Sequence, residues 1–184
     1  MKVVILCILQ SLFLTSIGFG SEMYIELRNF EERDLPDFYE WASDPDVTQF
    51  LMWDNYKNKE SAREFLVRVA IPHPWLKAIV CDGKVVGSIS LEPGKGSKQK
   101  VAEVGYVIAK KYWSRGIGTA ALKAALKTGF DDLDLVRIEA YVDPCNLASI
   151  KVIEKSGMTR EGYLRKCILQ KGVIKDRLLY ALTR

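Results

Sequence analysis

Two glycines, Gly116 and Gly118, stand at the start of a predicted helix and are preceded by Arg115. Glycine lets the backbone approach a ligand closely, and the first N–H groups of a helix have no partner inside it. The helix dipole adds partial positive charge at the same end. The segment from Arg115 to Thr119 therefore predicts an anion site suited to a pyrophosphate. The same Gly-x-Gly pattern is also found where a strand and a helix simply pack closely.

A strand and a helix joined by a short loop must hold this site. Residues 101–108 are mostly β-branched and aromatic and predict a strand, and residues 109–114 read as a polar loop. Residues 120–127 are strong helix formers. No Gly-Lys-Ser/Thr closes the turn, so it is not a Walker loop. A missing third glycine argues against a dinucleotide fingerprint.

The whole stretch reads Glu103-x-Gly105-Tyr106-x-Ile108, then Tyr112-Trp113-x-Arg115-Gly116-x-Gly118-Thr119. This pattern resembles motif A of the GNAT acetyltransferases, in the form carried by the Rim-type enzymes that acetylate the N-termini of ribosomal proteins. The resemblance implies acetyl-CoA as cofactor. It places pantetheine beside the strand and pyrophosphate on the loop, with contacts from Tyr106, Val107, Ile108, Arg115, Gly116, Ile117, Gly118 and Thr119. Trp113 departs from the Gln or Arg of the wider superfamily, as the Rim-like branch often does.

A second motif reads Arg137-Ile138-Glu139-Ala140, Asp143-x-x-Asn146-x-x-Ser149 and Glu154-Lys155-x-Gly157-Met158. It also resembles the GNAT enzymes, and the likeness covers roughly residues 24–182. Periodicity and turn residues predict a strand, two helices, three strands, a helix, a strand, a helix and two strands. We therefore expect an α/β (α+β) protein with the GNAT fold, in which a mixed, strongly twisted sheet of about seven strands carries four helices.

The helices are expected over residues 34–42, 59–70, 115–130 and 146–156, with N-caps at Asp34, Asn58 and Asn146. The strands are expected over residues 24–28, 75–81, 85–91, 101–108 and 136–142, with two more between 158 and 184. Asp82-Gly83 predicts a hairpin with a primed turn.

Acetylation of an amine needs a base that accepts a proton from the ammonium and an acid that protonates the leaving thiolate. The sequence pattern alone fits Glu103 equally well as a solvent-facing strand residue and as a catalytic residue. The resemblance favours the catalytic interpretation, because the matching Glu is the proposed base of the Rim-type enzymes. Many GNAT enzymes carry a Tyr acid where this chain has Ile153. The Rim-like alternative is Ser149, which in a first helical turn could equally bond a backbone group. Asn146 is expected to cap the helix and to bind pantetheine.

The resemblance also places one wall of the acceptor site at Trp53 and Asp54. Asp54 could hold a cationic amine, although a solvated loop acid is an equally good interpretation. His73, the only histidine, lies between two prolines and is expected to be a loop residue. The cysteines show no CxxC spacing, and no ligand cluster suggests a metal.

Residues 1–22 differ in composition from the rest of the chain. Lys2, an apolar run over residues 3–14 and small residues after it are typical of a signal peptide, and the run is short for a membrane span. The segment could be a secretory signal or anchor, an extension introduced upstream, or a helix packed on the domain. We expect the acetyltransferase domain to occupy residues 23–184, with residues 1–22 outside its fold.

Three functions stay open from the sequence. The first is an acetyl-CoA-dependent N-acetyltransferase that acts on a primary amine, with a peptide or protein α-amino group favoured over a polyamine or other small amine. The others are an acyl-CoA-binding module without turnover and a secreted protein. A net charge of +4 without a basic stripe argues against nucleic acid. We expect a cytoplasmic or nuclear monomer or homodimer that meets a membrane only if residues 1–22 anchor it.

Overall fold

A computed structural model describes residues 15–17 and 23–184 of the 184-residue chain. They form one sheet with the strand order β1-β2-β3-β4-β5-β6-β8-β7. Only β5 and β6 run parallel, and all other neighbours are antiparallel. The strands are β1 (Thr15–Ile17), β2 (Met23–Asn29), β3 (Leu76–Cys81), β4 (Lys84–Pro93), β5 (Val101–Ile108), β6 (Arg137–Val142), β7 (Thr159–Gln170) and β8 (Val173–Thr183).

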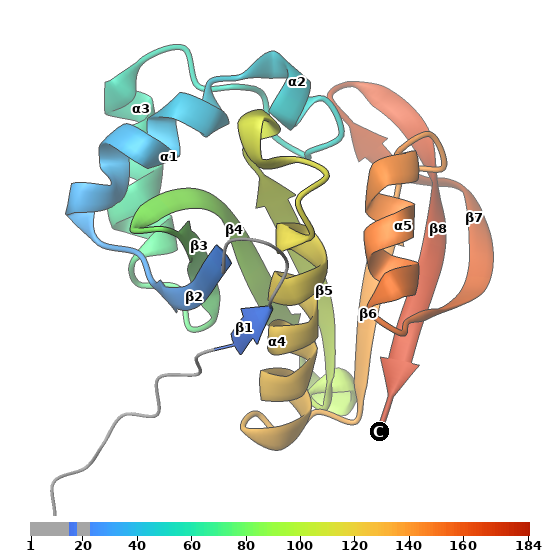
Figure 1. The fold of residues 1–184 in the computed structure, drawn as a ribbon. Coiled ribbons are helices and arrows are strands. Elements are labelled where there is room, and N and C mark those ends of the chain that lie inside the picture. Colours follow the sequence, from blue (N-terminus) through green and yellow to red (C-terminus); the bar gives the residue numbers. More distant parts are fainter. Residues whose placement is uncertain (1–14, 18–22) are drawn as a thin grey trace, which may run out of the picture.

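The helices cover both faces of the sheet. They are α1 (Leu35–Ala42), α2 (Pro45–Thr48), α3 (Lys59–Phe65), α4 (Ile117–Asp131) and α5 (Leu147–Lys155). Figure 1 shows α4 and α5 side by side along one face, in front of β5 and β6. Alternate residues of β3 enter two separate cores, because Ile79 packs in the α4 core and Ala78 packs in the α1 and α3 core.

The predicted fold class is confirmed. The seven predicted strands are also confirmed, and they correspond to β2 to β8. Three of the four predicted helices are α1, α4 and α5, and the fourth is α3 with the turn Leu66–Ala70 that continues it. The short helix α2 was not predicted. β1 adds an eighth strand, with Thr15 opposite Ile25. The rest of residues 1–22, where the sequence predicts an apolar leader or extension, lies outside the described residues.

The predicted caps differ in their outcome. Asn58 accepts from the Ser61 N–H at 2.9 Å and Asn146 from the Ser149 N–H at 3.1 Å, as expected of N-cap residues. Asp34 stands before α1, but its carboxylate binds the guanidinium of Arg28 at 2.7 and 2.8 Å instead of capping the helix. A buried carboxylate gains more from a bidentate arginine than from one backbone N–H.

The sheet splits between β5 and β6. The two strands pair at only three positions, Val101 with Arg137, Ala102 with Ile138 and Glu103 with Glu139. Beyond them, β5 continues on β4 as far as Ile108, while β6 continues on β8 as far as Val142. The backbone of β5 after Glu103 therefore has no strand partner on its β6 side. In the part of the chain that the structure describes, no helix is long and apolar enough to cross a membrane.

Candidate active site

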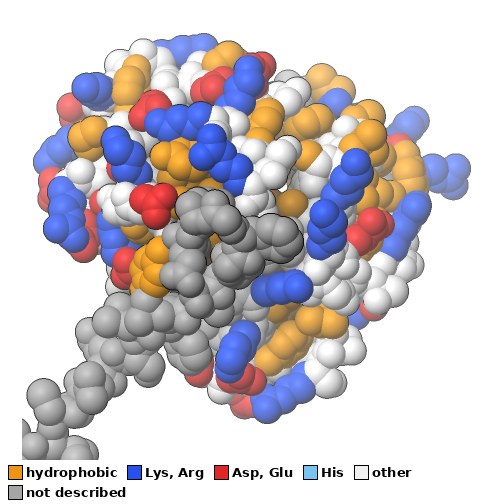
Figure 2. Space-filling model, in the orientation of Figure 1, with side chains coloured by type: hydrophobic (Ala, Val, Ile, Leu, Met, Phe, Trp, Pro, Cys, Tyr) orange, Lys and Arg blue, Asp and Glu red, His pale blue; other side chains and the backbone are white. Residues whose placement is uncertain are grey.

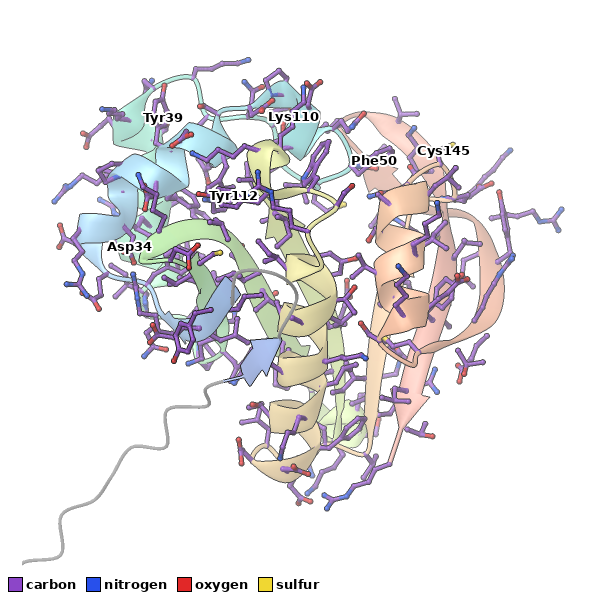
Figure 3. All side chains as sticks on the ribbon, viewed as in Figure 1. Asp34, Tyr39, Phe50, Lys110, Tyr112 and Cys145 are labelled. Carbon is purple, nitrogen blue, oxygen red and sulfur yellow. The ribbon has the colours of Figure 1, made fainter. Side chains whose placement is uncertain are left out.

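A cleft of about 570 Å³ opens where β5 and β6 separate. The end of β5, the loop before α4, the start of α5 and the segment after α2 supply its walls. The structure brings together ten residues predicted from the sequence on this cleft, namely Tyr106, Val107, Ile108, Arg115, Gly116, Ile117, Gly118, Thr119, Asn146 and Ser149. Figure 3 labels Phe50 and Tyr112, which line it, and Cys145, which lies in the turn before α5.

The start of α4 forms the floor of one end of the cleft. Gly116 is the N-cap and has a φ of +80°, a left-handed conformation that favours glycine, and a Cβ there would meet open space. No side chain caps the helix and its first turn holds no carboxylate, so the N–H groups of Ile117, Gly118 and Thr119 stay open to an anion. A Cβ on Gly118 would lie 3.6 Å from Val152, an ordinary contact.

The loop is fixed to the end of β5 by Trp113. Its indole N–H donates to the Ile108 carbonyl at 2.7 Å. The guanidinium of Arg115 stacks on the Tyr112 ring at 5.4 Å from its centre. These contacts give the indole at this position, which departs from the wider superfamily, a role in holding the loop against the strand.

Two lysines of the cleft were missed from the sequence. Lys151 and Lys155 line it from α5, one helical turn apart, on the side opposite Arg115. Figure 2 shows Lys and Arg side chains on both sides of this region. The acid Asp46 also lines the cleft, but Lys110 binds it at 2.5 Å. The i, i+4 spacing of lysines just after the Asn146 cap was the signal that could have revealed them.

The start of α5 presents Ser149 to β5. The hydroxyl of Ser149 lies 2.7 Å from the phenol oxygen of Tyr106, and that phenol also lies 3.2 Å from the Ser149 carbonyl oxygen. Burial raises the pKa of Tyr106 to about 12, although the Ser149 bond acts in the opposite direction. Ile153, at the position where many related enzymes carry Tyr, is 2% exposed and packs in the α4 core.

Glu103 lies at the last paired position before β5 and β6 separate, on the sheet face opposite α4. The strand register places Glu92 of β4 on one side of it and Glu139 of β6 on the other. Glu103 is exposed as a residue, but the partial desolvation of its carboxyl between the neighbouring strands raises its pKa above the usual range. The charges of Glu139 and Glu92 raise it further, while Arg177 acts in the opposite direction.

The two neighbouring carboxylates have partners of their own. Glu139 accepts from Arg137 at 2.6 Å and from the Tyr141 hydroxyl at 2.9 Å, and these bonds lower its pKa although burial opposes them. Glu92 lies 2.8 Å from the ring nitrogen Nε2 of His73. Among residues 15–17 and 23–184, Glu103 has neither a hydrogen-bond nor an ion-pair partner.

The turn of the β7–β8 hairpin is fastened to the segment after α2. Gln170 donates to the Leu51 carbonyl and Lys171 to the Thr48 carbonyl, both at 2.8 Å. The buried guanidinium of Arg177 donates to Gln170 at 2.8 Å and so supports the turn from inside. These contacts join two segments that are far apart in the sequence.

The two residues predicted for the acceptor wall belong to this segment and do not line the cleft. Trp53 packs on Tyr56, with ring centres 5.3 Å apart, beside the α1 and α3 core. Asp54 is largely exposed and lies 3.5 Å from Lys171. The negative charge of Asp54 is therefore paired with the positive charge of Lys171.

Comparison with known proteins places this geometry among acetyltransferases. Residues 25–159 match the model of the "Acetyltransferase (GNAT) domain" family. The chain resembles a GNAT-family acetyltransferase from Bacillus anthracis, with 30% identity and a TM-score of 0.79 over 92% of this chain and 97% of that one.

Two further relatives have named activities or ligands. Mycobacterium smegmatis RimJ, solved with CoA-disulfide, is 27% identical and superposes with a TM-score of 0.72 over 87% of this chain and 82% of that one. The spermidine N(1)-acetyltransferase of Escherichia coli K12 is 25% identical over 76% of this chain and 75% of that enzyme.

The hairpin contact gives a first prediction. Gln170→Leu removes one acceptor of the buried Arg177, which keeps the Asp176 carbonyl and Asp143, and it removes the donor to Leu51. We expect it to lower the free energy of unfolding by about 2–3 kcal/mol. Hydrogen exchange should accelerate over residues 48–54, which lose that contact. Lys175→Ala, at an exposed position of the same hairpin, should change stability by less than about 0.5 kcal/mol. Equal exchange over residues 48–54 in both variants would show that the hairpin does not hold the segment.

Proposed function

Since the chain belongs to the GNAT acetyltransferase family, it is an enzyme that transfers acetyl groups from acetyl-CoA, and we propose that its acceptor is the α-amino group of a peptide or protein. Within the family, we propose that it belongs to the Rim-like branch, whose members acetylate the N-termini of ribosomal proteins. The observation that carries the proposal is the position of Glu103. It is an unpaired carboxylate with a raised pKa, at the point where β5 and β6 separate.

The residues of the cleft fit the cosubstrate. Open N–H groups at the start of α4, together with Arg115, suit a pyrophosphate, and Lys151 and Lys155 add positive charge across the cleft. The edge of β5 from Tyr106 to Ile108 has no strand partner on its β6 side, and apart from the Ile108 carbonyl, which binds Trp113, its backbone groups are offered to the amides of pantetheine. Acetyl-CoA supplies the acetyl group as a thioester.

The side chains then divide the proton chemistry. Glu103 accepts a proton from the ammonium, which frees the nitrogen lone pair to attack the thioester carbon. A raised pKa suits this role, because the conjugate acid is closer in strength to the amine it deprotonates. Ser149 lies across the split and is proposed to give the proton that the leaving sulfur needs. Asn146 fixes Ser149 by accepting its backbone N–H.

The charges around the split favour an acceptor with one amine. A polyamine carries several charges and is matched by several free carboxylates. Here Asp46 and Asp54 are each paired with a lysine, and Glu139 with Arg137. Glu92 contacts His73, and among the described residues around the split Glu103 is the carboxylate without a hydrogen-bond or ion-pair partner, which suits the single charge of a peptide N-terminus. The hairpin from Cys167 to Leu178 can supply backbone contacts along an extended chain.

Two alternatives differ from this proposal in one respect each. A small-amine acetyltransferase shares the chemistry but not the acceptor, and the similarity to a spermidine acetyltransferase supports this alternative. A module that binds acyl-CoA without turnover shares the cleft but not the reaction, and the apolar Ile153 at the position of a family acid favours it. The following predictions separate the three.

Cosubstrate binding is tested at Gly118. Acetyl-CoA at one hundred times its Kd should stabilise the protein by about 2.7 kcal/mol and raise the Tm by roughly 5–10 °C. Gly118→Glu should abolish the rise, because it places a negative side chain at the anion site. Gly118→Ala should fold normally, since the added Cβ makes only ordinary contacts. Lys123→Glu, on the exposed side of α4, is the charge control. A full rise in Gly118→Glu would contradict the assignment of the site.

The base is tested by its pH dependence. Glu103→Gln should lower kcat/KM by about 10²–10⁴-fold while the Tm rise with acetyl-CoA is retained. Glu103 works deprotonated, so its raised pKa moves the acid limb of kcat/KM to higher pH than an ordinary carboxyl would give. Glu139→Gln removes a neighbouring negative charge and should move that limb to lower pH. Unchanged turnover in Glu103→Gln would exclude this residue as the base.

The acceptor class is tested with a panel. We expect short peptides with free N-termini to be acetylated faster than spermidine at equal concentration, and mass spectrometry identifies the products. N-terminally blocked peptides that keep their lysines provide the control for side-chain amines. Turnover of spermidine with no turnover of any peptide from a diverse N-terminal library would overturn the peptide proposal. No turnover of any amine would favour the binding module.

A further inference from the structure

The phenol of Tyr106 and the hydroxyl of Ser149 meet across the cleft. Tyr106 lies on β5 and Ser149 in the first turn of α5, on opposite sides of the split, and their oxygens are 2.7 Å apart. Both side chains line the cleft. The contact spans the place where the thioester would lie between the two halves of the sheet.

This contact differs from the usual bonding of a helical serine. A serine in a helix commonly donates to a carbonyl of the preceding turn. In the described chain, the Ser149 hydroxyl has the Tyr106 phenol as its hydrogen-bond partner and no bond to a carbonyl. The serine is thereby held toward the cleft instead of along its own helix.

The phenol is a dependable donor at this position. Burial raises the pKa of Tyr106 to about 12, so the side chain keeps its proton at neutral pH. That proton has two acceptors on Ser149, the hydroxyl oxygen at 2.7 Å and the carbonyl oxygen at 3.2 Å. The shorter contact is the productive one, because it leaves the proton of the serine free to point at the leaving sulfur.

We propose that Tyr106 is a positioning residue for Ser149, whose hydroxyl it orients and whose proton it replaces when the thiolate leaves. The inference rests on the proposed function, because it requires Ser149 to be the acid. It also explains how the enzyme works with Ile153 buried in the core. The phenol that many relatives carry on the last helix is supplied here from β5, on the other wall of the cleft.

The amine nitrogen forms a bond to the acetyl carbon, the carbon–sulfur bond breaks, and its electron pair stays on sulfur. Sulfur takes the proton of Ser149 Oγ, and Ser149 Oγ takes the proton of Tyr106, so no serine alkoxide accumulates. Starting from the ammonium, the nitrogen loses two protons, one before it attacks and one as the amide forms, and Glu103 passes each in turn to solvent. Solvent returns one proton to the tyrosinate, so the reaction releases one proton net.

Single and double variants test the pair, with acetyl-CoA and whichever amine the acceptor panel identifies. Tyr106→Phe should lower kcat by about 10–100-fold at an unchanged KM for acetyl-CoA, within the range of general acid catalysis. Ser149→Ala should lower kcat at least as much. The double variant should be no slower than Ser149→Ala, because groups that act as a unit are not additive.

Tyr180→Phe is the matched control. The phenol of Tyr180 also reaches from the sheet to α5, where it donates to Glu154 at 2.9 Å, but it lies outside the cleft lining. Its loss removes a comparable strand-to-helix bond, and kcat should stay within about twofold of the wild type. A fall in kcat in Tyr180→Phe equal to that in Tyr106→Phe would mean that Tyr106 only holds α5 in place.

A replacement that changes the acidity of the phenol but not its shape distinguishes proton donation by Tyr106 from packing of its ring. Fluorotyrosine at position 106 keeps the shape of the ring and lowers the pKa of the phenol, so the alkaline limb of kcat should move to lower pH. An unmoved limb, unchanged kcat in Tyr106→Phe, or multiplied losses in the double variant would overturn the inference. These results concern the variants alone, whereas failure of the proposed function is seen in the wild-type protein, as inactivity toward every peptide.

Discussion

Strands β5 and β6 pair at three positions and then separate, and the proposed chemistry depends on this short parallel ladder. A longer ladder would use the backbone groups of β5 from Tyr106 to Ile108, and no edge would remain for a ligand. A shorter one would leave Glu103 without Glu139 as its neighbour on β6. Each strand is held from its outer side, β5 by β4 and β6 by β8, so the split persists without distorting either half of the sheet. The start of α4 and the start of α5 then meet around the opening.

The split also separates two electrostatic environments. On the α4 side, open helix N–H groups and basic side chains suit a polyanion. On the opposite face, the carboxylates of Glu92, Glu103 and Glu139 lie next to one another on adjacent strands. Among the described residues, His73 contacts Glu92 and Arg137 binds Glu139, whereas Glu103 has no such partner. Burial and these like charges raise the pKa of Glu103, which suits its proposed role as the base. Tyr106 lies three residues further along β5, so in the proposed mechanism one strand carries groups for both proton transfers.

Local patterns predicted most of this architecture. β-branched strands, glycine at the helix start and the caps at Asn58 and Asn146 give short-range signals, and those elements appear where expected. Contacts between distant segments leave no short-range signal in the sequence, because they depend on tertiary packing. Examples are the bond of Tyr106 to Ser149, the attachment of Gln170 to Leu51 and the pairing of Asp54 with Lys171. Asp34 was predicted as a cap, but the sequence does not show that Arg28, one strand earlier, would take its carboxylate. Roles assigned to site residues stay predictions until they are tested in solution.

The most direct test is the crystal structure of the protein with a bisubstrate analogue, in which a peptide α-nitrogen is joined to CoA through an acetyl linker. The account predicts that the pantetheine lies between β5 and β6, with its amides bonded to the backbone of β5. The linker nitrogen should then lie within hydrogen-bond reach of Glu103, directly or through one water, and the sulfur beside Ser149. A pantetheine bound outside the split, or a linker nitrogen remote from Glu103, would contradict the account.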